Sequence, residues 1–510
     1  MKSRIIKKIL AIVIAAATLG ATPGLATAVN KKKGKCGKQI QCQAKSDDSK
    51  VEEDEAKSDE AKSNEGESSE GESSEGESSE GESSEAKSED SKVEEDEEDD
   101  TLIFNFLLNQ NLKNNAQKSQ FVNVVKNLAI KNFFDQYTNQ QIVDVANKLI
   151  QCANANDNNI RKNVAEIIAL MTKQDLFDEF ETNQIKGLTD MLAQCLNADD
   201  KNIQKNVAQA IALMAERKLF CEFQTNQVEN IISTLDQCAH SRKRITKKYV
   251  AKAIADFARG ELCDVFSKKQ IENLISALIQ CAGNSNQLTK RYVAAAVAWF
   301  TRKDKLNEFN PTQITTLTEA LTRSADAYDD DAKKYFTWTM GAFANKKLLK
   351  IFNPKQIKTL ALNLTRCLNT VTDDSFKKEF AWAVGQFANN GLFNRFIPAQ
   401  IFNLTLDLTL CSTVVEAKKN VAWAIQKFAT NSLFNGFSKK QISAITATLA
   451  QCSNASVALE AKSEAFKALV TLKDKGYFKN FSDNEFSNVR IALSNCLEKV
   501  YAERFSILNP

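Results

Sequence analysis

Residues 438–452 read SKKQISAITATLAQC, and this stretch contains the pattern that decides the fold. Its apolar residues are spaced i, i+3, i+7 and i+10, and they are Ile442, Ile445, Leu449 and Cys452. That spacing places them on one face of an amphipathic helix. The same stripe recurs over residues 142–152 and over residues 314–324, where Ser324 stands in place of the cysteine.

The cysteine that closes the stripe recurs along most of the chain. It is found at positions 152, 195, 238, 281, 367, 411, 452 and 496, with Ser324 filling the one vacant step. The intervals are 41 to 44 residues, and most are 43. Self-similarity at such a period is typical of repeat architectures, in which each unit is one supersecondary structure.

The start of the cysteine-bearing helix is marked as regularly as its end. A capping residue stands three positions before Gln or Glu, the spacing of a reciprocal capping box, at Ser267, Asn310, Asn353, Ser438 and Ser482. Prolines occupy the expected first helical position, where a missing amide hydrogen costs nothing, at Pro311, Pro354 and Pro398. These signals predict a helix start in each unit.

Each unit also contains a preceding helix, exemplified by residues 418–430 with Val421, Ile425 and Phe428 on its apolar face. A short aromatic joint, such as residues 433–437, connects the two helices. Helix pairs begin near positions 118, 161, 204, 247, 290, 333, 377, 418 and 462. Neither helix of a pair can bury its apolar face alone, so neighbouring units must stack.

The sequence therefore predicts an all-α fold, a right-handed superhelical α-solenoid of about nine helix-pair repeats of about 43 residues over residues 118–496. Residues 101–117 are expected to form an N-terminal capping helix, and residues 497–510 a C-terminal tail. A closed α/α barrel is the competing architecture. It needs about six hairpins that return to the start, whereas near-identical units after a polar extension favour an open array.

Two first helices resemble a known family at the level of residues. Ala381-Trp382-Ala383-Val384 and Ala422-Trp423-Ala424-Ile425, each after a Lys-Lys pair, resemble the ligand-lining third helix of an armadillo repeat. The chain is thus similar to the armadillo/HEAT-like superfamily, and two-helix HEAT-like units are as compatible with it as three-helix armadillo units. The armadillo family places a peptide-holding asparagine four residues beyond each tryptophan, where this chain has Ala342, Gln386 and Lys427.

The N-terminal 100 residues differ from the repeats in composition. Residues 1–28 have the basic, apolar and small-residue regions of a cleavable signal peptide, so we expect export to the periplasm or the extracellular space, although an uncleaved anchor is the alternative. Residues 29–42 form a basic segment in which Cys36 and Cys42 are spaced to close a small disulfide loop. Residues 43–100 carry a net charge of −20, include four GESSE units, and are expected to be a disordered acidic arm.

The regular cysteines are not expected to hold a metal or to form disulfides. A zinc site needs about four ligands, but each helix has one cysteine and His240 is the only histidine of the chain. Equivalent positions in stacked helices are about 8–10 Å apart, beyond the reach of a disulfide. Small buried thiols explain the pattern better. Because the sequence contains none of the common catalytic motifs, we predict that the protein is not an enzyme and needs no cofactor.

A candidate ligand-binding groove lies on the first helix of each unit. Cations recur two residues before the core position that Val421 occupies in its unit, and we single out Lys248, Arg291, Lys334, Lys378 and Lys419. Four residues further, on the same helix face, stand Trp338, Trp382 and Trp423, with Gln386 as the one residue that can replace the armadillo asparagine. Exposed aromatic residues beside cations are typical of contact surfaces. The alternative is that these tryptophans fill a gap between units and the lysines are a solvated face.

The residues of this groove give a leading hypothesis and two others. The leading hypothesis is a protein-interaction scaffold that binds an extended, anionic peptide or protein, because the residues outside the first hundred carry a net charge of +14. A nucleic-acid-binding repeat protein is the second hypothesis, since lysines contact phosphates and aromatic rings stack on bases. An enzyme on a helical-repeat scaffold is the least favoured. We expect no membrane insertion of the mature form.

Overall fold

The computed structural model describes residues 108–109, 112–178, 180–196, 200–307, 309–454, 458–479 and 481–508, and within these ranges the chain forms helices and no strand. The long helices alternate between a first and a second helix of each unit. The first helices are α3 (Asn115–Ile130), α5 (Asn158–Lys173), α7 (Lys201–Glu216), α9 (Arg244–Arg259), α12 (Gln287–Arg302), α14 (Asp330–Asn345), α16 (Asp374–Asn389), α18 (Lys418–Thr430) and α20 (Leu459–Asp474).

Each first helix is followed by a second helix that carries the recurring cysteine or its serine replacement. These helices are α4 (Asn139–Ala153), α6 (Thr182–Cys195), α8 (Glu229–Ala239), α11 (Lys268–Ala282), α13 (Pro311–Ala325), α15 (Pro354–Thr370), α17 (Pro398–Cys411), α19 (Lys439–Cys452) and α21 (Glu485–Leu508). Short turns of helix occur in some connections, namely η2 (Phe133–Gln136), α10 (Leu262–Val265), η3 (Leu348–Ile351) and η4 (Val415–Ala417).

The starts of the second helices confirm the capping signals. Reciprocal capping boxes form at Ser267, Asn310, Asn353 and Ser438, and prolines begin α13, α15 and α17. The exceptions are α8, which begins only at Glu229, and α21, which begins at Glu485, three residues after Ser482. In the unit of α8 the capping position is held by Gln224, a residue that caps a helix less well than Ser, Thr or Asn. Residues 225–227 form a turn in place of the first helical turn.

The ends of the first helices share one backbone device. A residue in the left-handed conformation follows most of them, for example Asp175 (φ 61°), Ser432 (φ 57°) and Gly391 (φ 70°). The next amide then donates back to the last helical turn, as the Leu433 amide does to the Phe428 carbonyl at 2.9 Å. This is the bond of a Schellman motif, which satisfies helix-end carbonyls and turns the chain into the aromatic joint.

The aromatic joints belong to the core and not to the surface. Phe393, in the joint after α16, is fully buried. Its ring centroid lies 5.6 Å from that of Phe387 in its own unit and 5.7 Å from that of Phe428 in the next unit. Burying a phenylalanine side chain stabilises a fold by roughly 1.5–3 kcal/mol. One joint therefore links two successive units.

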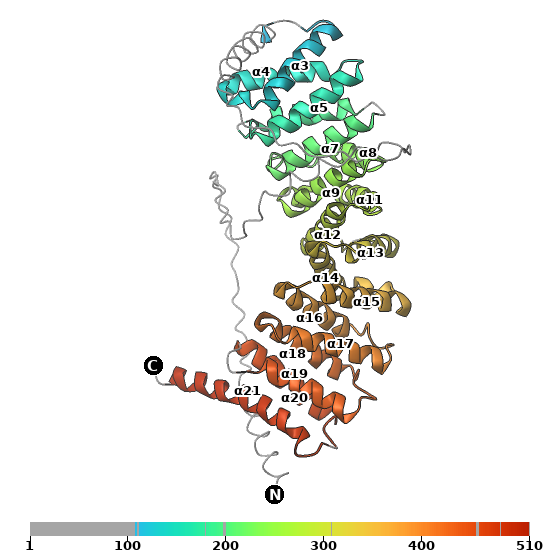
Figure 1. Ribbon diagram of the computed structural model, residues 1–510, viewed down its shortest axis with the longest axis vertical. Helices are drawn as coiled ribbons and strands as arrows, with labels where there is room; N and C mark the ends of the chain where they lie inside the picture. Colours follow the sequence, from blue (N-terminus) through green and yellow to red (C-terminus); the bar gives the residue numbers. More distant parts are fainter. Residues whose placement is uncertain are drawn as a thin grey trace, which may run out of the picture. The chain divides into compact units, whose positions relative to one another are not determined.

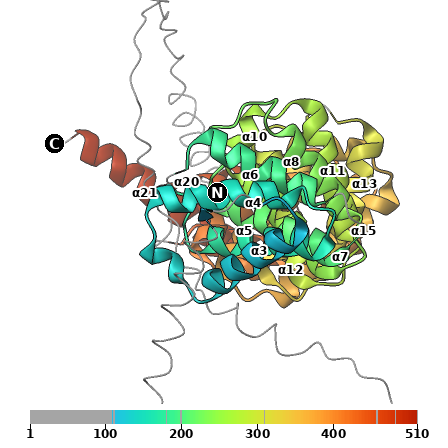
Figure 2. The ribbon, with the colours of Figure 1, turned by 90° about the horizontal axis from the view of Figure 1, so that it is seen from above.

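Helices of the same kind stack on their neighbours and make two layers. First helix packs on first helix from α3 to α20, and second helix on second helix from α4 to α21. Figure 1 shows α9, α12, α14 and α16 in one layer beside α11, α13 and α15 in the other. The contacts between first helices are the more extensive, because small residues such as Ala208, Ala251 and Ala294 are fully buried there. Figure 2, seen from above, shows successive units overlying one another.

The observed helices confirm an all-α solenoid with two long helices per unit. The first described unit begins with α3 at Asn115, slightly before the expected position 118. Most of the capping helix expected over residues 101–117 lies outside the described residues. Residues 497–508, expected as a tail, continue α21 to Leu508. The right-handed superhelix and the total number of repeats remain predictions.

Candidate binding site on the first helices

The three tryptophans singled out in the sequence lie on successive first helices, α14, α16 and α18, and all are half-buried. Trp338 and Trp382 stack, with ring centroids 6.2 Å apart and planes inclined by 22°. We call Trp338, Trp382 and Trp423 the tryptophan row. The stacking shows that the row is continuous across unit boundaries.

The positions of Trp382 and Trp423 are each set by a glycine in the preceding unit. The indole of Trp382 lies so close to Gly341 that a Cβ on this glycine would approach Cζ3 of the ring to 2.5 Å. Gly385 is in the same close contact with Trp423. The expectation that this position is solvent-facing is therefore only partly correct, because one edge of each ring fills the space that a missing Cβ leaves.

The sequence contains a signal for this contact between tryptophan and glycine, although the sequence analysis did not predict it. A glycine follows three residues after a tryptophan in Trp338-Thr-Met-Gly341 and in Trp382-Ala-Val-Gly385. Glycine in a helix interior is unfavourable by roughly 1 kcal/mol relative to alanine, so it needs a reason. Each of these glycines accommodates the tryptophan of the next unit.

The indole N–H groups of the tryptophan row donate no hydrogen bond to any described residue, and they are not among the buried unpaired polar atoms. The ring of Trp423 also carries Lys427 above it, with the ammonium 5.7 Å from the ring centroid. A fourth tryptophan, Trp299 on α12, has the Arg302 guanidinium 5.1 Å from its centroid. The row thus combines apolar ring surface, nearby cations and hydrogen-bond donors that an external acceptor can use.

The expected strip of cations is less positive than its sequence suggests. Lys334 pairs with Asp373 at 3.6 Å, and Lys419 pairs with Glu460 at 2.5 Å. Arg291 lies 3.7 Å from Asp329 and 3.6 Å from Asp331. All four acids lie at the start of the following first helix. Asp329 and Asp373 cap it, and Asp331 and Glu460 lie in its first turn. Much of the cation column is therefore neutralised between units.

Two cations of the column have other surroundings. Lys378 is exposed and makes no ion pair with a described residue. Lys248 is half-buried, and its ammonium lies 5.4 Å from the centroid of the Tyr249 ring. Near Lys378, burial raises the pKa of Glu379, and the charges of Lys378 and Lys334 oppose that rise. Lys378 is therefore an exposed positive charge on this face that pairs with no described carboxylate.

Gln386 does not present its side chain as the resemblance implied. The residue is only 8% exposed, and its Oε1 is a buried atom without a hydrogen-bond partner. It lies in the tightly packed layer of first helices, where Gly385 before it contacts Trp423. The prediction that Gln386 holds a ligand backbone needs a side-chain movement that this structure does not contain.

A second group on the first helices was not anticipated, and we call Glu216, Lys252, Asp256 and Tyr292 the charged cluster. Lys252 on α9 bonds Glu216 of the preceding unit at 2.8 Å. Asp256, one turn further along α9, has a buried Oδ2 without a hydrogen-bond partner. Burial raises its pKa from the ordinary 3.8 to about 6, opposed by Lys252 and assisted by Glu216. Burial likewise raises the pKa of Tyr292.

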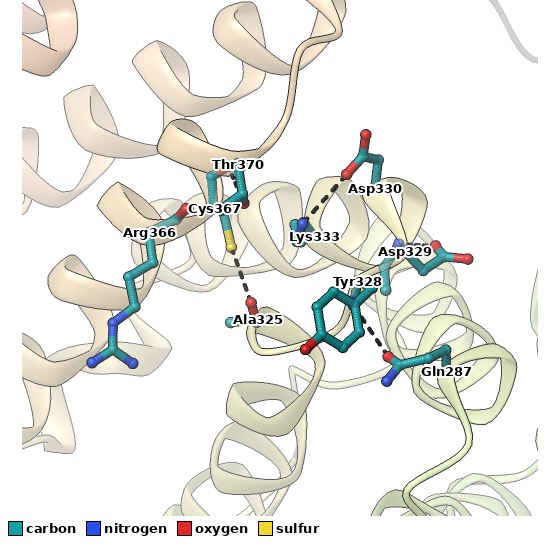
Figure 3. Close-up of polar contacts among 10 residues, drawn as sticks. Gln287, Ala325, Tyr328, Asp329, Asp330, Lys333, Arg366, Cys367 and Thr370 are labelled. Atoms are coloured by element: carbon teal, nitrogen blue, oxygen red, sulfur yellow. Dashed lines mark hydrogen bonds and ion pairs between the residues drawn. The ribbon is translucent and has the colours of Figure 1, made fainter.

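The recurring cysteines are buried, as predicted, and this is so for Cys152, Cys195, Cys238, Cys281, Cys367, Cys411, Cys452 and Cys496. Burial raises the pKa of the Cys367 thiol to about 12. Figure 3 shows this thiol directed at the Ala325 carbonyl, 3.7 Å away, with Lys333 and Asp330 forming a separate ion pair nearby. Ser324 instead donates to the Lys290 carbonyl at 3.1 Å, as the Cys238 thiol does to the Gln204 carbonyl at 3.6 Å. The position therefore suits a small, weakly donating residue.

A hollow with a volume of about 780 Å³ lies elsewhere, between α6 and the end of α7. Phe180, Leu219 and Cys221 contribute to its lining. Two of the charged groups around it are engaged within the protein: Arg217 pairs with Asp175, and Glu222 accepts a hydrogen bond from Thr182. Nothing in its chemistry selects a ligand.

Several predictions concern residues outside the described part of the chain. They are the signal peptide, the basic segment with Cys36 and Cys42, and the acidic arm of residues 43–100. Within the described ranges, no group of three or more His, Cys, Asp or Glu side chains is arranged to hold a metal ion. No described helix combines the length and the apolar character needed to cross a membrane.

Comparisons with known proteins give similarity at the level of structure. No family model matches the chain, and the search of curated proteins finds no match. The yeast importin-beta (Kap95p) structure is similar with a TM-score of 0.42 and 13% identity, covering 76% of this chain and 48% of that one. The SYS-1 structure is similar with a TM-score of 0.43 and 12% identity, covering 74% and 76%. The chain thus spans about half the length of importin-beta.

Proposed function

We propose that this protein is an interaction scaffold that binds an extended segment of a partner protein along the tryptophan row. The observation that carries the proposal is that three stacked units present half-buried indoles whose N–H groups have no acceptor in the described protein. Aromatic anchors of this kind dominate binding energies at protein interfaces. The unpaired N–H groups are complementary to the carbonyl oxygens of an extended backbone.

The partner segment is expected to carry acidic residues close to the tryptophans. Lys378 makes no ion pair, and Lys427 lies over the ring of Trp423, so both cations stand beside the row. The pairing of Lys334, Lys419 and Arg291 with protein acids limits this positive region to a short stretch. We therefore expect one or two acidic residues in register with α16 and α18 to strengthen binding.

Nucleic-acid binding remains the second hypothesis, and the ion pairs count against it. Affinity for nucleic acid depends mainly on cations that neutralise phosphates, and most cations of the column already have partners. The Trp338 and Trp382 rings already stack on each other, which leaves no gap between them for a base. These features favour a protein ligand.

A capture experiment with two matched variants tests the proposal. Mature protein, Trp382→Phe and Tyr328→Ala are used as baits, with and without nuclease treatment of the extract. Trp382→Phe keeps a ring against Gly341 but removes the N–H donor, whereas Tyr328 is an 89% exposed aromatic residue in the loop between α13 and α14. Partners retained after nuclease, lost with Trp382→Phe and kept with Tyr328→Ala support the proposal. Loss of all partners after nuclease overturns it in favour of nucleic acid.

A further inference from the structure

Two neighbouring second helices, α15 and α17 (Figure 1), carry exposed leucines that form an apolar ridge, and α19 packs against α17. Leu362 is 52% exposed, Leu406 46% and Leu410 54%. Leu362 and Leu406 occupy equivalent positions in adjacent units, and Leu410 lies one turn beyond Leu406 on the same helix face. Side chains of this size gathered on adjacent helices mark a contact surface more often than leucines scattered singly.

The composition of α17 supports this interpretation. Unlike a typical surface helix, which is polar on its outer side, α17 (PAQIFNLTLDLTLC) places two leucines, Leu406 and Leu410, on its exposed face. Its one charged residue, Asp407, is buried and accepts a hydrogen bond from Thr365 of α15 at 2.8 Å. On the other side, Thr409 bonds Thr448 of α19 at 2.9 Å. The three helices are thus fixed to one another and present a preformed surface.

The rim of the apolar ridge is cationic. Neither α15 nor α19 contains an acidic residue, so Asp407 is the only one within the three helices. Lys355, Lys358 and Lys440 are exposed and make no ion pair with a described residue. Arg366 lies 3.7 Å from Asp326 with both side chains well exposed, and in Figure 3 it points away from the other charged groups. Lys439 is within electrostatic reach of Glu485.

These lysines do not serve the stability of their own helices. Lys355 and Lys440 lie in the first turns of α15 and α19, next to the positive end of the helix dipole. A cation at that end is unfavourable by a few tenths of a kcal/mol up to roughly 1 kcal/mol. Their placement is better explained by a negatively charged partner.

We propose that Leu362, Leu406 and Leu410, with Lys355, Lys358 and Lys440, form a second docking surface, which binds an acidic amphipathic helix of another protein. We call these six residues the second-helix patch. Leucines on the partner helix would cover the apolar ridge, and acidic side chains flanking them would meet the lysines at both ends. The surface is separate from the tryptophan row, which lies on the first helices.

Two other occupants fit less well. A second copy of the chain facing through the same patch would place lysines opposite lysines, which is destabilising. An anionic lipid surface is favoured by side chains that protrude several ångströms, whereas the patch leucines are about half sunk into the helix layer. Because α15, α17 and α19 are held side by side, an amphipathic helix of another protein fits this surface better than a membrane or a second copy does.

The test uses the full mature chain and a fluorescent synthetic peptide with leucines on one helical face and glutamates on the other. Anisotropy titrations are expected to show binding that weakens at least tenfold with Leu406→Asp and with the charge reversal Lys355→Glu/Lys440→Glu. The matched controls are Ile130→Asp, an equally exposed apolar residue at the end of α3, and Lys201→Glu in the first turn of α7. Both controls are expected to bind like the unmodified protein.

The remaining arms separate this surface from its alternatives and from the proposed function. Trp382→Phe should leave peptide binding unchanged, whereas a parallel loss with Trp382→Phe would move the site to the first helices and overturn the proposal. Equal binding of a lysine-for-glutamate peptide, or of a scrambled peptide of the same composition, also overturns it. So does binding to phosphatidylglycerol vesicles in place of the peptide, or a dimer in sedimentation equilibrium that Leu406→Asp dissociates.

Discussion

The same position of the repeat is used in two different ways along the first helices. In α9 it is Lys252, which reaches back to Glu216 of the preceding unit at 2.8 Å. In α16 it is Trp382, which reaches back to Gly341 of the preceding unit and covers its missing Cβ. The residue differs completely, but in both places its side chain holds two units together.

This comparison shows that the position is primarily a joint between units, whose chemistry the sequence can exchange. The ion pair of the charged cluster depends on pH and salt, because its partners are partly exposed to solvent. The ring-on-glycine contact of the tryptophan row depends on close packing. Stability in one region should therefore respond to ionic conditions, and in the other to the volume of a single side chain.

The largest effect is expected from Gly341→Ala. The new Cβ would lie 2.5 and 2.7 Å from two ring atoms of Trp382 and 2.9 Å from the Cα of Ala383, so both a ring and a backbone must move. Overpacking of this kind typically costs 1–3 kcal/mol, and we expect a loss of about 3 kcal/mol in the free energy of unfolding. All four tryptophans lie in α12 to α18, so urea unfolding followed by intrinsic fluorescence reports on this region.

Gly187→Ala is the matched control for that measurement. Its Cβ would be 3.4 Å from Ile150, an ordinary contact, so better helix propensity should make this variant as stable as the parent or more stable. The double variant Gly341→Ala/Trp382→Ala should recover part of the loss, since the ring that clashes is gone. No recovery would show that the backbone of Ala383, and not the tryptophan, sets the spacing of these units.

A smaller effect is expected from Trp382→Ala. The variant loses the contact with Gly341 and the stacking with Trp338, and because the ring is half-buried we expect a loss of about 2 kcal/mol. Lys252→Ala, at the equivalent position of the charged cluster, should cost less. Equal melting temperatures for Trp382→Ala and the parent protein would mean that the row is purely a ligand surface.

The helical architecture was predictable from the sequence because its signals are local. Capping boxes such as Ser438 with Gln441 and prolines at first helical positions each act within one helix, and they appear as expected in α11, α13, α15, α17 and α19. The environment of the cations was not predictable, because it depends on register between units. Lys334 meets Asp373, and Lys419 meets Glu460, about 40 residues away in the chain, and only the stacking of helices brings them together.

The binding site was predictable only in part for the same reason. The positions of Trp338, Trp382 and Trp423 on one face followed from helical periodicity, but the burial of Trp382 and Trp423 depends on glycines in other units. Gln386 is buried by packing that a single helix does not reveal. The ridge of Leu362 and Leu406 was not predicted, because the repeated apolar pattern marks the buried face of each second helix and these leucines lie on the exposed face.

The buried carboxyl group of Asp256 makes the stability of the protein depend on pH. Its pKa is about 6 in the folded protein against an ordinary 3.8, so the folded state binds this proton more tightly than the unfolded chain. The contribution of Asp256 to stability therefore falls as pH rises from about 4 to 6, and its penalty is fully present above that range. Asp256→Asn should flatten this slope and raise stability at pH 7 by ~1 kcal/mol. Asp264→Asn, at an exposed position, should leave the slope unchanged in urea titrations between pH 4 and 7.

The smallest effect is expected from Glu216→Gln, which breaks the ion pair of the charged cluster and leaves its shape almost intact. Glu216 is about half exposed, so the pair with Lys252 should contribute less than about 1 kcal/mol, and less still at high salt. The change should be clearer in the pKa of Asp256, which the negative charge of Glu216 helps to raise. Carboxyl NMR titration should place that pKa below 6 in the variant, while the fluorescence transition of the tryptophan row stays where it is. An unchanged Asp256 pKa would mean that burial alone sets it, and a shifted fluorescence transition would mean that the two regions unfold as one unit.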